Sequence, residues 1–285
     1  MQNKFNINQL LQEAVILQQE GKFDKAGYLY REILKTQPKH PDANHNLGVI
    51  INNKKNSTEA LKLFKIAVEK NPYSEQFWIS YTNLLIKENK LEEAKFNIKK
   101  AIVINSSVAK FHYNLGFIFF EMNKFEEAEI SYRKAIKLKP NYIDAYNNLS
   151  ITLFKLGRFE NAEIILKKMI EFNPDNFMTH YNLGALLHIF DKLEKAEISF
   201  KKSIELKPDH ADAYYNLGVI YNQLGKLIES EKFLKIALNY NSTDKKVINE
   251  YGELLLKKNQ HQKGLKFIHK GSGVIEFTQL NFKIF

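Results

Sequence analysis

The feature that most constrains this chain is a period of 34 residues that runs through nearly its whole length. Small residues and prolines recur at this interval, at Ala26, Ala60, Ala94, Ala128, Ala162 and Ala196, and at Pro38, Pro72, Pro140, Pro174 and Pro208. Blocks that start at residues 7, 41, 75, 109, 143, 177, 211 and 245 divide residues 7–278 into eight equal parts without an insertion, behind a lead of residues 1–6. Such a period indicates stacked supersecondary units, each covering the apolar face of its neighbour.

Within a block the apolar residues have helical spacing. In the block that starts at 109, Leu115, Ile118 and Phe119 share one face, and Ala128, Tyr132 and Ala135 share another. A polar break at Met122, Asn123 and Lys124 separates the two stretches, and Pro140 ends the second one. Each block therefore predicts a helix, a short turn and a second helix, and the whole chain predicts an all-α solenoid.

The residues at fixed block positions resemble the tetratricopeptide repeat (TPR). The matching pattern is Leu-Gly at positions 7 and 8, an aromatic or aliphatic residue at 11, Ala at 20, Phe, Tyr or Leu at 24, Ala at 27 and Pro at 32. The pattern holds over residues 7–278, which include part of a non-repeat segment at 272–285. The resemblance implies a right-handed superhelix of eight repeats, with the first helix of each repeat lining the concave side.

The small residues predict where the helices of one repeat cross. Gly116 and Ala128 allow a close crossing, whereas Thr82 and Ser150 replace the glycine and require a slight widening. We expect the ring at position 4 to contact the preceding repeat; this ring belongs to Trp78, His112, Tyr146, His180 and Tyr214. Histidines separated by multiples of the period are too far apart to bind one metal ion, so neither a metal nor a cofactor is predicted.

Charge and composition narrow the class of partner. The net charge is +10, but the surplus lysines lie on the second helices among glutamates, and the positions that the resemblance assigns to the groove are nearly neutral. This distribution favours a protein or peptide partner and disfavours nucleic acid. The sequence has no cysteine, no signal peptide pattern and no apolar run long enough for a transmembrane segment, which predicts a cytoplasmic protein.

Block position 6 carries asparagine in five of the six inner blocks, at Asn46, Asn114, Asn148, Asn182 and Asn216, with Ser80 in the sixth. One carboxamide can pair with both the N–H and the C=O of a peptide unit. The row resembles the asparagine ladder in the TPR superhelix of O-linked N-acetylglucosamine transferase, which grips a peptide backbone. Asparagine is also common at this position in TPRs generally, so a structural role is the alternative.

Aromatic residues accompany this row in the middle of the predicted groove, at Tyr113, Tyr181, Tyr215, Phe117, Phe120 and Phe154. An exposed aromatic patch would form a side-chain pocket for a peptide. Packing between repeats is the alternative. The basic residues of the carboxylate clamp found in chaperone-binding TPRs are missing at the matching positions.

The C-terminal residues 272–285 depart from the repeat. Gly271 and Gly273 should end the last helix, and Leu280, Phe282 and Ile284 alternate with polar residues as in a strand. We expect this segment either to cap the last repeat or to dock a partner.

Together these features predict a non-catalytic scaffold that binds an extended peptide or a partner helix in its concave groove. The helix pairs leave no room for a catalytic domain, and no catalytic motif is present. One alternative is an accessory subunit that recruits substrates to a separate transferase or oxygenase. The other is a nucleic-acid or membrane-surface binder that uses the convex lysines.

Overall fold

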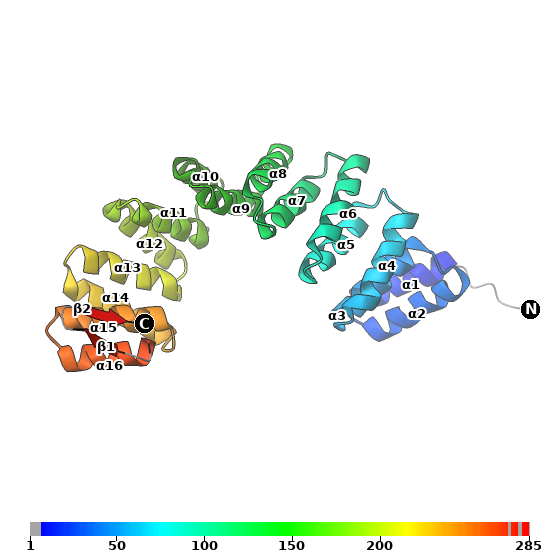
Figure 1. The fold of residues 1–285 in the computed structure, drawn as a ribbon. Coiled ribbons are helices and arrows are strands. Elements are labelled where there is room, and N and C mark those ends of the chain that lie inside the picture. Colours follow the sequence, from blue (N-terminus) through cyan, green and yellow to red (C-terminus); the bar gives the residue numbers. More distant parts are fainter. Residues whose placement is uncertain (1–6, 273–274, 279–280, 285) are drawn as a thin grey trace, which may run out of the picture. The chain divides into compact units, whose positions relative to one another are not determined.

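The computed structural model describes residues 7–272, 275–278 and 281–284, the last two segments by their backbone only (Figure 1). Within these ranges sixteen α-helices form eight successive pairs, numbered below as repeats 1 to 8. The first helices are α1 (Ile7–Gln19), α3 (Pro41–Asn53), α5 (Glu75–Lys87), α7 (Ala109–Glu121), α9 (Ile143–Lys155), α11 (Phe177–Ile189), α13 (Ala211–Gln223) and α15 (Lys245–Lys257). The second helices are α2 (Phe23–Thr36), α4 (Ser57–Lys70), α6 (Leu91–Ile104), α8 (Phe125–Leu138), α10 (Phe159–Phe172), α12 (Leu193–Leu206), α14 (Leu227–Tyr240) and α16 (His261–Ser272).

The helices confirm the all-α class, and each first helix begins at the residue where a sequence block begins. The chain divides into two compact units, Met1–Gly157 with α1–α9 and Arg158–Phe285 with α10–α16. The division falls inside repeat 5, between its helices α9 and α10. The lead of residues 1–6 lies outside the described residues.

The turn between the two helices of each repeat has the same backbone conformation throughout. Position 15 has a positive φ in every repeat, at Gly21, Lys55, Asn89, Asn123, Gly157, Asp191, Gly225 and Asn259. Glycine, asparagine and aspartate tolerate this left-handed conformation, and Lys55, with a φ of 65°, is the one long side chain that adopts it. In the seven repeats that lie within one unit, the turn reverses the chain so that the apolar stripes of the two helices face each other.

The two helices cross most closely between positions 8 and 24. A Cβ added at Gly116 would lie 2.7 Å from Cδ1 of Tyr132, and one added at Gly48 would lie 2.8 Å from the ring of Phe64. Gly184 meets Phe200 in the same way. The predicted role of the glycine is confirmed, and the group that requires it is the buried side chain at position 24.

Repeat 3 shows the predicted widening. Thr82 occupies position 8 and is fully buried, and position 24 there carries Ile98 in place of an aromatic ring. The helices α5 and α6 pack together less closely than α3 with α4 or α7 with α8. The smaller Ile98 and the wider spacing together accommodate the threonine.

Successive repeats are joined by a recurring hydrogen bond from position 4. The side chain there donates to the backbone carbonyl oxygen six residues upstream, at the end of the preceding repeat. The bonds are Asn44 to Pro38 (3.0 Å), Trp78 to Pro72 (2.7 Å), His112 to Ser106 (2.9 Å) and His180 to Pro174 (2.7 Å). Since a carbonyl oxygen only accepts, Nε2 carries the proton in both histidines. The predicted contact with the preceding repeat is confirmed for Trp78, His112 and His180, whereas the ring of Tyr214 stacks on Phe233 and Tyr240 of its own repeat.

The C-terminal segment forms a two-stranded antiparallel hairpin, β1 (Ile275–Thr278) and β2 (Asn281–Ile284), in which Ile275 pairs with Ile284. The strand predicted at Phe282 and Ile284 is therefore present, while Gly273 and Leu280 lie outside the described residues. Whether the segment caps the array or docks a partner stays a prediction, because only its backbone is described.

The close crossing predicts a large penalty for one added methyl group. Gly116→Ala should lower the free energy of unfolding by about 1–2 kcal/mol, because overpacking against the buried Tyr132 ring outweighs the better helix propensity of alanine. Gly27→Ala is the matched control, because its added Cβ would be 3.6 Å from the nearest atom, and it should be neutral or stabilising. Urea unfolding followed by circular dichroism measures both; equal effects would contradict the crossing geometry.

The left-handed turn at Lys55 predicts a stabilising substitution. Lys55→Asn introduces the residue that repeats 3, 4 and 8 carry at this position, and it should raise the free energy of unfolding by about 0.5–1 kcal/mol. The reverse change Asn89→Lys, at the same turn of repeat 3, should lower the free energy of unfolding by a similar amount. Thermal unfolding of the two variants should show shifts of opposite sign.

Candidate functional site

In each unit the first helices of neighbouring repeats lie side by side. α5 contacts α7 and α7 contacts α9 in the N-terminal unit, and α11 contacts α13 and α13 contacts α15 in the C-terminal unit. The side chains at positions 5, 6, 9, 12 and 13 of these helices form one surface in each unit, which we call the first-helix surface. The residues predicted to bind a peptide belong to it.

Position 5 of one repeat hydrogen-bonds to position 6 of the next. The amide of Asn148 donates to the hydroxyl of Tyr113 (3.2 Å), and the amide of Asn216 donates to the hydroxyl of Tyr181 (3.2 Å). In repeats 2 and 3, His45 Nε2 bonds to the hydroxyl of Ser80 (3.0 Å). Three pairs, two of tyrosine with asparagine and one of histidine with serine, thus make the same contact 35 residues apart.

Other polar side chains also join neighbouring repeats. His188 bonds to Gln223 (2.8 Å), both of them in the C-terminal unit. Near its end, Asn222 donates to Glu250 (2.7 Å) and accepts from Lys257 (2.9 Å). The first-helix surface is therefore a ladder of intramolecular hydrogen bonds, a feature that the sequence analysis did not foresee.

The predicted asparagines have different environments. Asn114 is only 2% exposed and donates to Oδ1 of the exposed Asn83 (3.0 Å). Asn46, Asn148, Asn182 and Asn216 are half-buried, and Oδ1 of Asn46 faces His45 Nδ1 (3.0 Å). Asn83, at position 9, was not among the predicted residues. The signal that could have identified Asn83 is an asparagine on the first helix of the repeat before Asn114.

The predicted aromatic residues are half-buried, and three of them lie against other rings of their own repeat. The ring centroid of Tyr113 lies 5.1 Å from that of Tyr142, and that of Tyr181 lies 4.7 Å from that of His210. Phe120 contacts Phe125 within its own repeat (5.4 Å), while Phe117, Phe154 and Tyr215 are half-buried on the same helices. These ring contacts lie within single repeats, so packing of the rings between repeats stays a prediction. Tyr113 and Tyr181 contact the next repeat through the hydrogen bonds from asparagine to their hydroxyls.

Burial controls the ionisation of these groups. It raises the pKa of Tyr113 and Tyr181, so both hydroxyls stay protonated as hydrogen-bond partners of asparagine. Burial also raises the pKa of Tyr215, as do the nearby carboxylates of Glu250 and Asp244. The ammonium of Lys110 lies 4.4 Å from the Tyr113 ring centroid, and burial lowers its pKa.

The lysines of the second helices are mixed with glutamates, as predicted. Lys167 pairs with Glu163 (2.7 Å), and Lys201 pairs with Glu197 (2.6 Å), each one helical turn apart. Exposed pairs of this kind contribute little stability and mark a solvated face. Within residues 7–272 no three His, Asp or Glu side chains are grouped as a metal site would need, and no helix is long and apolar enough to cross a membrane.

The His45 contact predicts a pH dependence of stability. Burial lowers the pKa of this imidazole below its usual value of 6.5, so the unfolded chain binds a proton more readily than the folded one. The contribution of His45 to the free energy of unfolding is therefore fully present above pH 6.5 and is lost as the pH falls below it.

His45→Asn, which introduces the residue found at position 5 of repeat 5, should make stability less sensitive to acid. Urea unfolding at pH values above and below 6.5 tests this, because the gap between wild type and variant should narrow on the acid side. Parallel profiles for the two proteins would assign the effect to other groups.

Comparison with known proteins agrees with the helix pairs and their period. Models of the tetratricopeptide repeat match residues 11–75, 109–142, 131–164, 165–198 and 199–232, which is more than half of the chain.

Solved structures of TPR proteins have the same fold. YrrB, described as a TPR protein with an unusual peptide-binding site, is 26% identical, with a TM-score of 0.55 over 69% of this chain and 97% of its own. A TPR protein from Parabacteroides merdae is 16% identical, with a TM-score of 0.63 over 88% of this chain and 98% of its own. MamA is 21% identical, with a TM-score of 0.53 over 58% and 90%. Since its helix pairs, its period and the family models agree, the chain belongs to the tetratricopeptide repeat family.

Proposed function

We propose that the protein is a non-catalytic interaction scaffold that binds an extended peptide along its first-helix surface. The observation that carries this proposal is the pairing of asparagine with tyrosine between repeats, at Tyr113 with Asn148 and at Tyr181 with Asn216. These bonds hold half-buried carboxamides in fixed orientations. A preorganised carboxamide loses less side-chain entropy when it binds a peptide.

The donors and acceptors that each carboxamide does not use within the protein determine which peptide groups it can bind. Asn148 uses one N–H for Tyr113, which leaves its second N–H and its carbonyl oxygen for a peptide unit. Asn216 donates to Tyr181 and also to the backbone oxygen of Asp212 (3.0 Å), so only its carbonyl oxygen is left, and it would accept from a peptide N–H. Both contacts are to the backbone and place little demand on peptide sequence.

Selectivity would come from the half-buried aromatic residues. Tyr113, Phe117, Phe120 and Phe154 lie with Asn148 in the N-terminal unit, and Tyr181 and Tyr215 lie with Asn216 in the C-terminal unit. Their exposed edges can contact apolar side chains of a peptide. Asn46 and Asn182 extend the row of carboxamides, whereas Asn114 contributes through Asn83, the exposed member of its pair.

Two further observations support a scaffold. YrrB is described as having a peptide-binding site and is similar to this chain over two thirds of its length. The polar groups of the first-helix surface are engaged in bonds between repeats and are not arranged about a reacting atom. The cytoplasmic location stays a prediction from the sequence.

Peptide arrays of random sequence test the carboxamide contacts. Asn148→Ala and Asn216→Ala should each weaken binding about fivefold across most sequences, because each removes hydrogen bonds worth about 1 kcal/mol to the peptide backbone. Asn97→Ala is the matched control, since Asn97 lies on the second helix α6 and bonds only to the backbone of Glu93 (2.9 Å). Phe117→Ala should instead change which sequences bind. If both groove variants bind like the wild type with unchanged helicity, the carboxamides are structural.

A further inference from the structure

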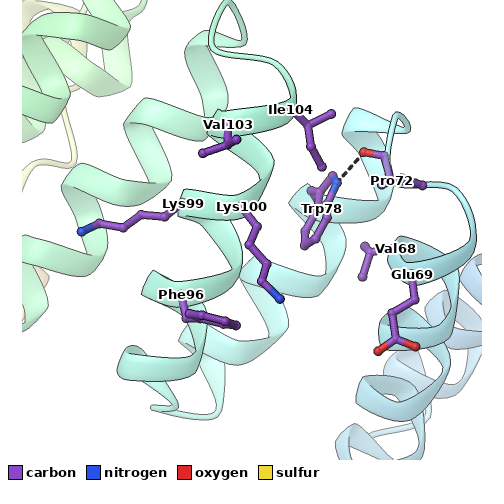
Figure 2. Close-up of a pocket in the computed structure, with 9 residues that line it drawn as sticks. All are labelled: Val68, Glu69, Pro72, Trp78, Phe96, Lys99, Lys100, Val103 and Ile104. Atoms are coloured by element: carbon purple, nitrogen blue, oxygen red, sulfur yellow. Dashed lines mark hydrogen bonds between the residues drawn. The ribbon is translucent and has the colours of Figure 1, made fainter.

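A pocket lies away from the first-helix surface, in the N-terminal unit, where α4, α5 and α6 meet (Figure 2). Its volume is about 520 Å³, and most of its lining is apolar: Val68, Pro72, Trp78, Phe96, Val103 and Ile104. Trp78, 5% exposed, is held in place because its indole N–H donates to the carbonyl oxygen of Pro72 (2.7 Å). The pocket therefore has a fixed aromatic wall.

The pocket belongs to the repeat whose helices are set apart. Thr82 widens the crossing of α5 and α6, and the residues that α6 contributes to the pocket lie on this same helix pair. Most of the pocket and the wider helix spacing thus lie in the same repeat.

Two apolar side chains at the mouth of the pocket remain in water. Phe96 is 59% exposed and Val103 is 87% exposed, and they lie seven residues apart on one face of α6. Val103 occupies position 29, which carries a charged or polar residue in repeats 1, 2 and 4 to 7: Lys35, Glu69, Lys137, Glu171, Glu205 and Asn239. Stacking of repeats does not require an apolar residue there, so its exposure favours a partner.

The charges at the mouth limit what that partner can be. Lys100 lies between Phe96 and Val103 in sequence, and its ammonium is 4.3 Å from the centroid of the Phe96 ring. Figure 2 shows Lys100 reaching into the space between α6 and α4, whereas Lys99 points away from it. Lys100 has no ion pair within the described residues, and Glu69 stands on the opposite wall. A carboxylate of the partner would be attracted to the Lys100 ammonium, whereas a carboxylate placed beside Glu69 would be repelled.

We propose that this pocket is a second protein-binding site, which takes an acidic amphipathic segment of a partner protein. An apolar side chain of the segment enters between Phe96 and Val103 against Trp78, and a carboxylate next to it pairs with Lys100. Phe96, Lys100 and Val103 lie at i, i+4 and i+7, the spacing with which one helix face meets another. The site is independent of the groove proposed above.

Trp78 is the only tryptophan of the chain, so it reports on this pocket directly. The probe is a synthetic amphipathic peptide with Leu and Glu on one face and a dansyl group at its end, and the signal is energy transfer from Trp78. We expect saturable transfer with the Glu peptide and at least about tenfold weaker binding of a peptide with Lys in place of Glu.

Three exposed substitutions on α6 test the contacts. Phe96→Lys and Val103→Lys place a lysine at the mouth of the pocket. Repeats 2 and 4 carry lysine at the same positions, as Lys62 and Lys137, so the fold should tolerate both substitutions. Each should weaken the Glu peptide about tenfold or more. Lys100→Glu should reverse the preference between the two peptides. Circular dichroism checks that all three variants keep their helices.

Two variants serve as controls. Ile130→Lys changes the same position on α8, where the side chain is 69% exposed but does not line the pocket, and Asn148→Ala changes the first-helix surface. Both should bind the Glu peptide like the wild type. Absence of transfer, or equal binding by Phe96→Lys, would overturn the proposal. A change in Trp78 fluorescence that appears on raising the protein concentration alone, and is lost in Phe96→Lys, would also overturn it, because the occupant would then be a second copy of the chain. The same change on adding anionic vesicles would show that the occupant is a lipid surface.

Discussion

The close crossing at positions 8 and 24 is the constraint on which the rest of the array depends. Because the ring of Tyr132 fills the space of a Cβ on Gly116, the two helices of that repeat have one separation and one register. The side chain at position 4 then reaches a backbone carbonyl near the end of the preceding repeat, as His112 and His180 do. The first helices consequently lie near enough for side chains 31 or 35 residues apart to bond, which produces the ladder on the first-helix surface.

The period made the fold predictable because it repeats each structural requirement eight times. A single Leu-Gly pair is weak evidence for a fold. The same pair, repeated in phase with Ala at position 20 and Pro at position 32, indicates only a stacked array of helix pairs. Even the irregular repeat could be predicted, since Thr82 cannot fit beneath an aromatic ring. The compensation by Ile98 follows from the same geometry and was present in the sequence.

The partners of the asparagines could not be predicted from position alone. Asn114 and Asn148 occupy the same position, and Asn148 bonds to Tyr113 at position 5 of the preceding repeat. The repeat before Asn114 carries the apolar Ile79 at position 5, and Asn114 bonds to Asn83 instead. The choice depends on two residues in different repeats, and a single repeat pattern does not contain it. The exposed apolar residues at position 22, such as Phe96 and Ile130, escaped notice for a related reason. An apolar residue in a helical pattern has the same sequence signature whether it lies in the core or in water, so the exposure of Phe96 and Ile130 follows only from the structure.

Departures from the repeat separate stacking from other demands. Stacking imposes the same packing requirement on every inner repeat, so a residue that differs in one repeat must have a local reason. For Thr82 that reason is inside the molecule, because Ile98 and the wider α5–α6 spacing accommodate it. For Val103 it is not, because this side chain is exposed at a position where the neighbouring repeats carry Glu69 and Lys137. Beside it lie the Phe96 ring and the Lys100 ammonium, which has no ion pair within the described residues. An internal irregularity that is compensated belongs to folding, whereas an external one without compensation indicates a surface that a partner completes.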